Sequence, residues 1–141
     1  MGGEVRKPAR GRRIRGQSLI ELALLLPVLI VVLLGIAEFS RLWYAFITVD
    51  NAARVGAQYG AQSREAARDV AGIEAAVREE IATLFDVTPS NPSVYVLSGT
   101  DPYGYAFVSV TVTYFFRPLL PVPGIPSSLN LTKTSVMRVR P

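Results

Sequence analysis

Cysteine and histidine are both absent from this 141-residue chain. Without them the chain cannot form disulfides, cysteine-ligated metal sites, thiol nucleophiles or histidine-based catalytic triads. No nucleophile–base pair, phosphate-binding loop or metal-ligand spacing takes their place. The sequence therefore predicts a protein that is not an enzyme and that needs no metal or cofactor.

Acidic residues are almost absent from the first sixteen positions. Of the chain's 15 basic and 11 acidic residues, six basic and one acidic lie in residues 1–16, which leaves nine basic and ten acidic for the rest. Because the excess positive charge is confined to this leader, the net charge of +4 does not indicate a nucleic-acid partner. The leader is rich in Gly, Pro and Arg and lacks apolar periodicity, so it should be disordered or removed.

Charged residues are also missing from Leu22 to Ala37, and Leu19 and Ile20 extend this apolar run at its start. At ~1.5 Å per helical residue the run can cross a hydrocarbon core of ~30 Å. The sequence predicts a membrane-spanning helix in contact with lipid. Pro27 should kink it, because proline has no amide hydrogen for the helical ladder. Basic residues before the span favour a cytoplasmic N-terminus. Most single-span proteins have such a flank, so the leader can also be interpreted as an ordinary flank of this kind.

The helix should continue past the span as an amphipathic segment to about residue 61. Trp43 and Tyr44 lie where an interfacial aromatic belt is expected. Glu38 and Arg41, three residues apart, should form a salt bridge at the outer interface. The small residues of 51–61 permit either close helix packing or a frayed helix end.

A second helix is expected from Ser63, a plausible N-cap, with apolar residues on one face at Ala66, Val70, Ile73, Val77, Ile81 and Leu84. After a break at 88–92 the pattern changes to a period of two. Strands are predicted at Val94–Leu97, Ala106–Phe116 and Leu131–Val139, with a turn at 99–104. The fold class is α+β: a long N-terminal membrane-spanning helix that becomes amphipathic, a second helix, and a small antiparallel sheet.

Two features of the sheet region can be predicted more closely. In the long strand, one face carries Val108, Val110, Val112 and Tyr114 and should be buried, whereas the serine and threonine face should not. The proline-rich segment Arg117–Pro126 should be a surface loop. Three apolar residues expected to be exposed there, Leu119, Leu120 and Val122, indicate a contact surface.

A basic leader, Gly16, a polar pair, two aliphatic residues, Glu21 and an apolar run together resemble the processing site of type IV prepilins. The resemblance implies cleavage by a prepilin peptidase between Gly16 and Gln17, which makes Glu21 the fifth mature residue. An ordinary secretory signal is cut beyond its apolar region after small residues, and no convincing site of that kind follows Leu34.

Further motifs narrow the resemblance to the TadE-like pseudopilins of the tight-adherence (Flp) pilus system. Ile20-Glu21-Leu22-Ala23 is followed by Pro27, as in that family. Gly35 and Glu38 resemble its Gly-x-x-Glu element, and residues 52–58, with Arg54, Gly56 and Ala57, resemble its Ala-Ala-Arg-x-Gly-Ala-Arg element. The similarity covers residues 15 to about 61. It implies a pilin-like fold and a minor subunit that helps to assemble a Tad-type pilus for adhesion.

A carboxylate deep in a membrane helix costs ~2.5–3.5 kcal/mol on insertion scales, so Glu21 needs an explanation. Cleavage after Gly16 would expose the positive α-amino group of Gln17. In an assembled bundle that group could pair with Glu21 of a neighbouring subunit and set the axial register. The alternative is that Glu21 reaches back to the cytoplasmic headgroups.

The sequence thus divides into a leader (1–16), a transmembrane and extended helix (17–61) and an extracytoplasmic helix-plus-sheet domain (62–141). The predicted location is the cytoplasmic (inner) membrane, with a single pass. Expected partners are the prepilin peptidase, other pilins and pseudopilins, the inner-membrane pilus assembly platform and membrane lipid. Two alternatives remain open: an uncleaved single-span protein whose outer domain scaffolds or binds a partner, and a surface adhesin that uses the proline-rich loop.

Overall fold

The structure is a computed structural model that describes residues 12–84, 86–120 and 126–140. The chain divides into two compact units, Met1–Ala37 and Glu38–Pro141. The first helix, α1 (Arg12–Gly60), begins in the first unit and ends in the second. The two units are described separately below.

In the first unit the described residues belong to α1, which starts at Arg12 and not at Gln17. Residues 12–16 are therefore helical and not disordered, because most residues other than glycine and proline continue a helix readily. The other alternative, that the leader is removed, stays a prediction. The earlier part of the leader lies outside the described residues. α1 is assigned as one helix through Pro27, and the kink there stays a prediction.

The second unit contains a three-stranded antiparallel sheet in the order β1-β2-β3. Its strands are β1 (Ser93–Thr100), β2 (Ala106–Phe116) and β3 (Leu129–Arg138). β2 has the predicted bounds, and the other two strands are longer or shifted relative to prediction. Residues 99 and 100, expected in the turn, extend β1 because they pair with Phe107 and Ala106. The α+β fold class predicted from the sequence is confirmed.

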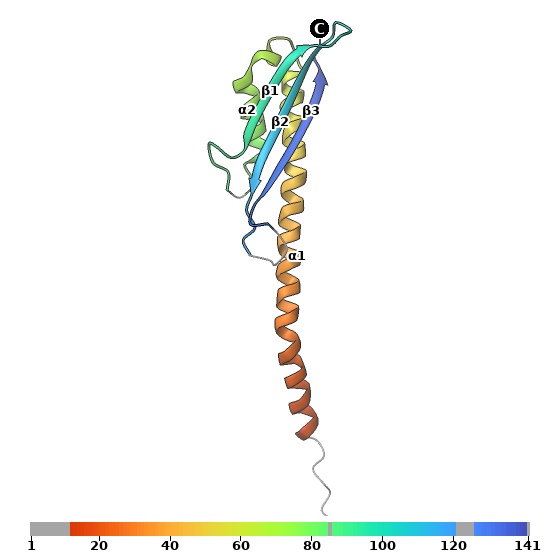
Figure 1. Cartoon of the computed structure of the whole chain (residues 1–141), viewed down its shortest axis with the longest axis vertical. Coiled ribbons are helices and arrows are strands. Elements are labelled where there is room, and N and C mark those ends of the chain that lie inside the picture. The colour runs from red at the N-terminus through yellow and green to blue at the C-terminus, as the bar shows by residue number, and fades with distance from the viewer. Residues whose placement is uncertain (1–11, 85, 121–125, 141) are drawn as a thin grey trace, which may run out of the picture. The chain divides into compact units, whose positions relative to one another are not determined.

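One face of the sheet forms the core together with the two helices. Side chains at alternate positions of β2 are buried, as the period of two predicted. They belong to one apolar cluster with residues from α1 and from α2 (Val70–Ile81), and Figure 1 shows both helices on the same side of the sheet. The buried members of this cluster on the helices include Ala45, Val49, Ala52, Ala53, Ala57, Ile73, Val77 and Ile81.

The start of the second helix differs from the prediction. Ser63 does not cap α2; its hydroxyl accepts a hydrogen bond from Ala66 N at 3.0 Å, at the start of a short 3-10 helix, η1 (Ala66–Arg68). The N-cap of α2 is Asp69, whose carboxylate accepts from Gly72 N at 3.0 Å and from the Tyr59 hydroxyl at 2.9 Å. These bonds, the one from Gly72 first, lower the pKa of the Asp69 carboxyl.

The segment between α2 and β1 is attached to the sheet by Asn91. Its side-chain amide donates to Phe115 O at 3.2 Å, and its carbonyl accepts from Phe115 N at 2.9 Å. Arg78 of α2 donates to Pro89 O of the same segment at 2.9 Å. The break predicted at 88–92 is therefore an ordered connection that joins α2 to the end of β2.

The small residues near the end of α1 permit close packing, which resolves the alternative left open by the sequence. α1 remains helical to Gly60, and Gly56 is buried against α2 and β2. A Cβ atom at Gly56 would lie 2.6 Å from Val77 Cγ2 and 3.2 Å from Val110 Cγ1. The absence of a side chain at this position thus allows helix α1 to approach both elements.

We expect Gly56→Val to destabilise the second unit by about 1–3 kcal/mol, because a larger side chain must displace Val77 and Val110 in a packed core. Thermal unfolding of the full chain in detergent measures this effect. Gly35→Val is the matched control, since no atom lies within 4 Å of a Cβ at Gly35. An unchanged melting temperature for Gly56→Val would show that α1 does not pack this closely.

Candidate functional site

The residues around the predicted processing point lie in exposed helix. Gly16 and Gln17 are exposed, and no atom lies within 4 Å of a Cβ placed at Gly16. Gln17 Nε2 donates to Glu21 Oε1 at 3.3 Å, one helical turn away. The Glu21 carboxylate is thus exposed on α1, on the same helix face as the residue that cleavage would make the N-terminus.

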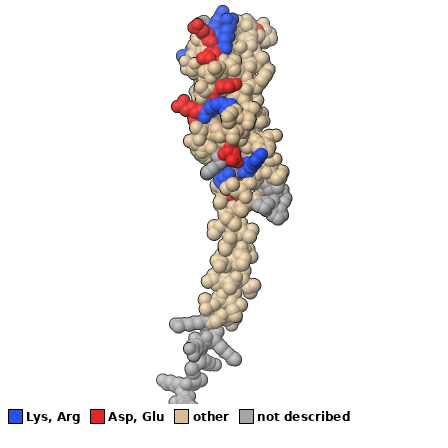
Figure 2. All heavy atoms as spheres, turned by 90° about the vertical axis from the view of Figure 1, so that its left-hand side faces the viewer, with Lys and Arg blue, Asp and Glu red and all other residues tan. Residues whose placement is uncertain are grey.

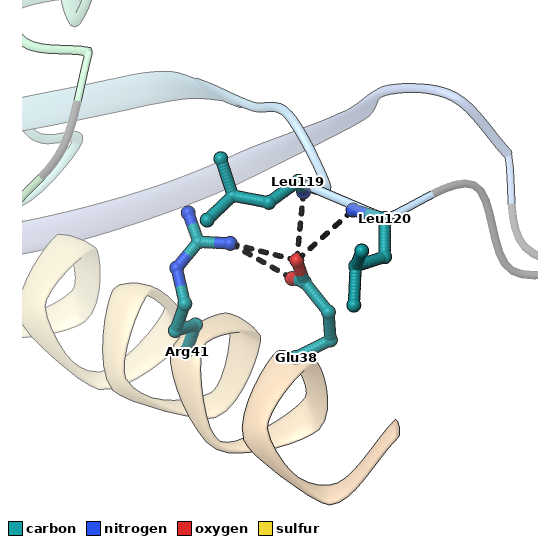
Figure 3. A network of polar contacts seen from close by, with 4 residues as sticks. All are labelled: Glu38, Arg41, Leu119 and Leu120. Atoms are coloured by element: carbon teal, nitrogen blue, oxygen red, sulfur yellow. Dashed lines mark hydrogen bonds and ion pairs between the residues drawn. The ribbon is translucent and has the colours of Figure 1, made fainter. Parts of the chain in front are cut away.

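Glu38 is buried, with 7% of its surface exposed, at the first position of the second unit. Its carboxylate accepts two hydrogen bonds from Arg41 Nη1, at 3.0 and 2.8 Å. It also accepts from the backbone N–H groups of Leu119 and Leu120, at 2.7 and 3.2 Å. Figure 3 shows these contacts converging on one carboxylate that joins α1 to the loop after β2.

The predicted Glu38–Arg41 salt bridge is confirmed, with an N–O distance of 2.8 Å. Its environment was not predicted. The Arg41 guanidinium lies 5.3 Å from the centroid of the Phe116 ring, at the end of β2. Glu38 and Arg41 thus contact both the last residue of β2 and two residues of the loop after it.

Of the two aromatic residues predicted at the interface, Trp43 belongs to a stacked row, whereas the Tyr44 hydroxyl is hydrogen-bonded to the Thr83 hydroxyl at 3.1 Å. Phe39 and Trp43 have ring centroids 6.3 Å apart, and Trp43 and Phe46 have centroids 5.9 Å apart. All three rings are exposed. Lys133 of β3 lies 3.7 Å from the Phe46 ring centroid and 3.7 Å from Asp50, so the row ends at a charged group. The placement of Trp43 and Tyr44 in a membrane interface stays a prediction.

The structure does not gather the residues singled out from the sequence into one site. Gly16, Gln17, Glu21, Pro27 and Gly35 belong to the first unit, where Pro27 is exposed and Gly35 is half-buried. In the second unit, Glu38, Gly56 and Ala57 are buried, whereas Arg54 is exposed. The residues that resemble the family's motifs therefore have different surroundings. Glu38 binds a loop, whereas Gly56 and Ala57 pack in the core.

Sequence reasoning missed the loop's attachment to Glu38. Leu119 and Leu120 are more than 80 residues away from it in the chain, and the contact depends on how the sheet packs against α1. One signal was present, because consecutive backbone N–H groups in a segment that cannot join a sheet require an acceptor elsewhere. Of the predicted exposed residues, Leu119 is exposed, Leu120 is only half-buried, and Val122 lies outside the described residues.

The distribution of charge and apolar surface distinguishes the two units. Side chains from Leu22 to Leu34 are exposed on α1 and carry no charge. On the face shown in Figure 2, the charged side chains lie over the second unit. Within the described residues, α1 is the one helix long and apolar enough to cross a membrane. An exposed, uncharged helical surface of this length is typical of a lipid-embedded segment.

These features define a class: a membrane-anchored α+β protein in which one N-terminal helix supplies both the anchor and part of the core of a small helix-plus-sheet domain. Residues 16–58 match the sequence model of the TadE-like protein family. This match confirms the resemblance predicted from the sequence for that part of the chain, and it supports a TadE-like protein of the Tad pilus system. The TadE-like family is a structural, non-enzymatic kind of protein. No curated protein and no solved structure matches the chain.

Proposed function

We propose that this protein is a pseudopilin, a minor pilin-like subunit that is cut between Gly16 and Gln17 and helps to assemble a Tad-type pilus for adhesion. The observation that carries the proposal is the exposed Gly16–Glu21 segment at the start of an apolar helix, inside the TadE-like match. The size of the second unit supports a minor role. A helix-plus-sheet domain on every subunit would crowd the surface of a thin filament.

The partners follow from this role. The prepilin peptidase would act on the leader, membrane lipid would surround the apolar run, and other pilins, pseudopilins and the inner-membrane assembly platform would receive the processed chain. The exposed Glu21 carboxylate supports subunit pairing because nothing in the described structure encloses it. The hydrogen bond that Glu21 accepts from the uncharged Gln17 amide is long, at 3.3 Å, and a positively charged amino terminus could replace it.

We expect the mature protein to begin at Gln17 in cells that contain the matching peptidase. Intact-protein mass spectrometry of the membrane fraction measures this directly. A large side chain in Gly16→Phe should leave the leader attached, whereas Gly35→Phe, a glycine of the same helix beyond the cleavage point, should be processed normally. Recovery of only the full-length mass with an active peptidase would remove the pseudopilin proposal and favour an uncleaved anchor.

We further propose that the second unit lies outside the cytoplasm, because the basic leader should stay inside. A reporter that is active only outside the cytoplasm, fused after Pro141, should be active, and a cytoplasm-specific reporter at the same position should not. The opposite pattern would contradict the orientation. A loop deletion that abolishes attachment while pili still assemble would favour the adhesin alternative.

A further inference from the structure

We propose that the loop of residues 117–120 is a second membrane contact, which rests in the headgroup layer of the membrane that the apolar run crosses. The inference rests on the membrane anchor of the proposed function, but not on cleavage or on pilus assembly. The apolar run ends at Ala37, and Glu38 is the next residue in the chain. Glu38 therefore lies at the boundary of the hydrocarbon core.

Glu38 holds the loop at this boundary. Its carboxylate accepts from Leu119 N at 2.7 Å and from Leu120 N at 3.2 Å, so the loop backbone is within hydrogen-bonding distance of the first residue after the span (Figure 3). A residue that ends a membrane span can move only with the span. The loop must then remain near the membrane surface for as long as these bonds persist.

The side chains around this contact suit a lipid interface. Leu119 is 72% exposed, although it is a large apolar residue, and α1 carries the exposed rings of Phe39 and Trp43 within about a turn and a half of Glu38, on another face of the helix. Arg117 adds positive charge 5.2 Å from the centroid of the Phe115 ring, whereas the charge of Arg41 is paired with Glu38. Exposed apolar and aromatic groups interleaved with arginine are typical of interfacial surfaces.

The membrane is the occupant that these observations favour over a protein partner. Glu38, which binds the loop, directly follows the span in the chain, and its carboxylate is buried. Anionic and zwitterionic headgroups supply the phosphates that arginine binds. A second copy of this chain or another subunit would need no such proximity to the span.

A single cysteine tests the proposal cleanly, because the chain has none of its own. The full chain carrying Leu119→Cys with a nitroxide label is reconstituted into vesicles of phosphatidylethanolamine and phosphatidylglycerol. Tyr103→Cys is the matched control. It is 82% exposed and lies in the turn before β2, at the opposite end of that strand from the loop.

The label at 119 should collide more often with oxygen than with a water-soluble nickel chelate, and the label at 103 should show the reverse order. Adding Glu38→Ala should move the label at 119 toward the behaviour of the label at 103. Equal water accessibility at 119 and 103 would overturn the proposal, and so would protection of 119 from both reagents, which indicates a protein contact. Failure of the chain to co-float with vesicles would overturn the anchor itself, whereas an uncleaved mass would count only against processing.

Discussion

Glu38→Ala should release the loop after β2 and lower the stability of the second unit by about 2–4 kcal/mol, because it removes one partner of a largely buried ion pair and two backbone hydrogen bonds. The side chain of Glu38 is 9% exposed and that of Arg41 is 23% exposed. Water can therefore solvate the remaining arginine in part, which places the expected effect below the 3–5 kcal/mol typical of fully buried pairs.

Two measurements separate loss of the loop contact from general unfolding. Thermal unfolding of the full chain in detergent gives the stability, and limited chymotrypsin digestion reports cleavage between Leu119 and Leu120 below the melting temperature. Glu38→Gln keeps an acceptor for the loop but loses the charge, so it should fall between the native protein and Glu38→Ala. Glu79→Ala, which removes an exposed carboxylate on α2, should change neither measurement. Native-like digestion of Glu38→Ala would show that the carboxylate does not hold the loop.

Glu21→Ala should insert into the membrane and be processed, yet it should no longer be recovered with other pilus subunits. Insertion becomes easier, because a carboxylate in a membrane helix costs ~2.5–3.5 kcal/mol. Assembly should fail, because the amino terminus of a neighbour loses its counter-charge. A pairing energy of only about 1.4 kcal/mol corresponds to a tenfold change in association, so the loss in co-purification should be large.

Glu21→Gln tests whether charge or shape matters, since it keeps the size of the side chain and removes its charge. If charge alone sets the register, both variants should be equally defective in co-purification and piliation, with a normal mature mass. Glu79→Gln removes an exposed carboxylate outside the span and serves as the control for charge loss. Native-like assembly of both Glu21 variants would mean that Glu21 reaches to the headgroups instead, and a block in processing would assign it to peptidase recognition.

Much of the fold could be predicted from local patterns. β2 and its buried face follow from the alternation of valine with serine or threonine. Because successive side chains of a strand point to opposite faces, the valines can all be buried only when their face of the sheet is the covered one. The start of α2 could not be predicted in the same way. Ser63 and Asp69 are both acceptable N-caps, and the bond from Tyr59 to Asp69 depends on how α1 lies beside the next helix.

The sequence by itself determined the anchor and its chemistry: an uncharged run long enough to span a bilayer, a basic leader before it, and Gly16, Gln17 and Glu21 at its start. These are properties of adjacent residues, which composition and spacing describe completely. Only the tertiary structure decided what Glu38 and Gly56 do. Their partners lie far away in the chain, so the binding of the loop by Glu38 and the close approach permitted by Gly56 exist only once the sheet has packed against α1.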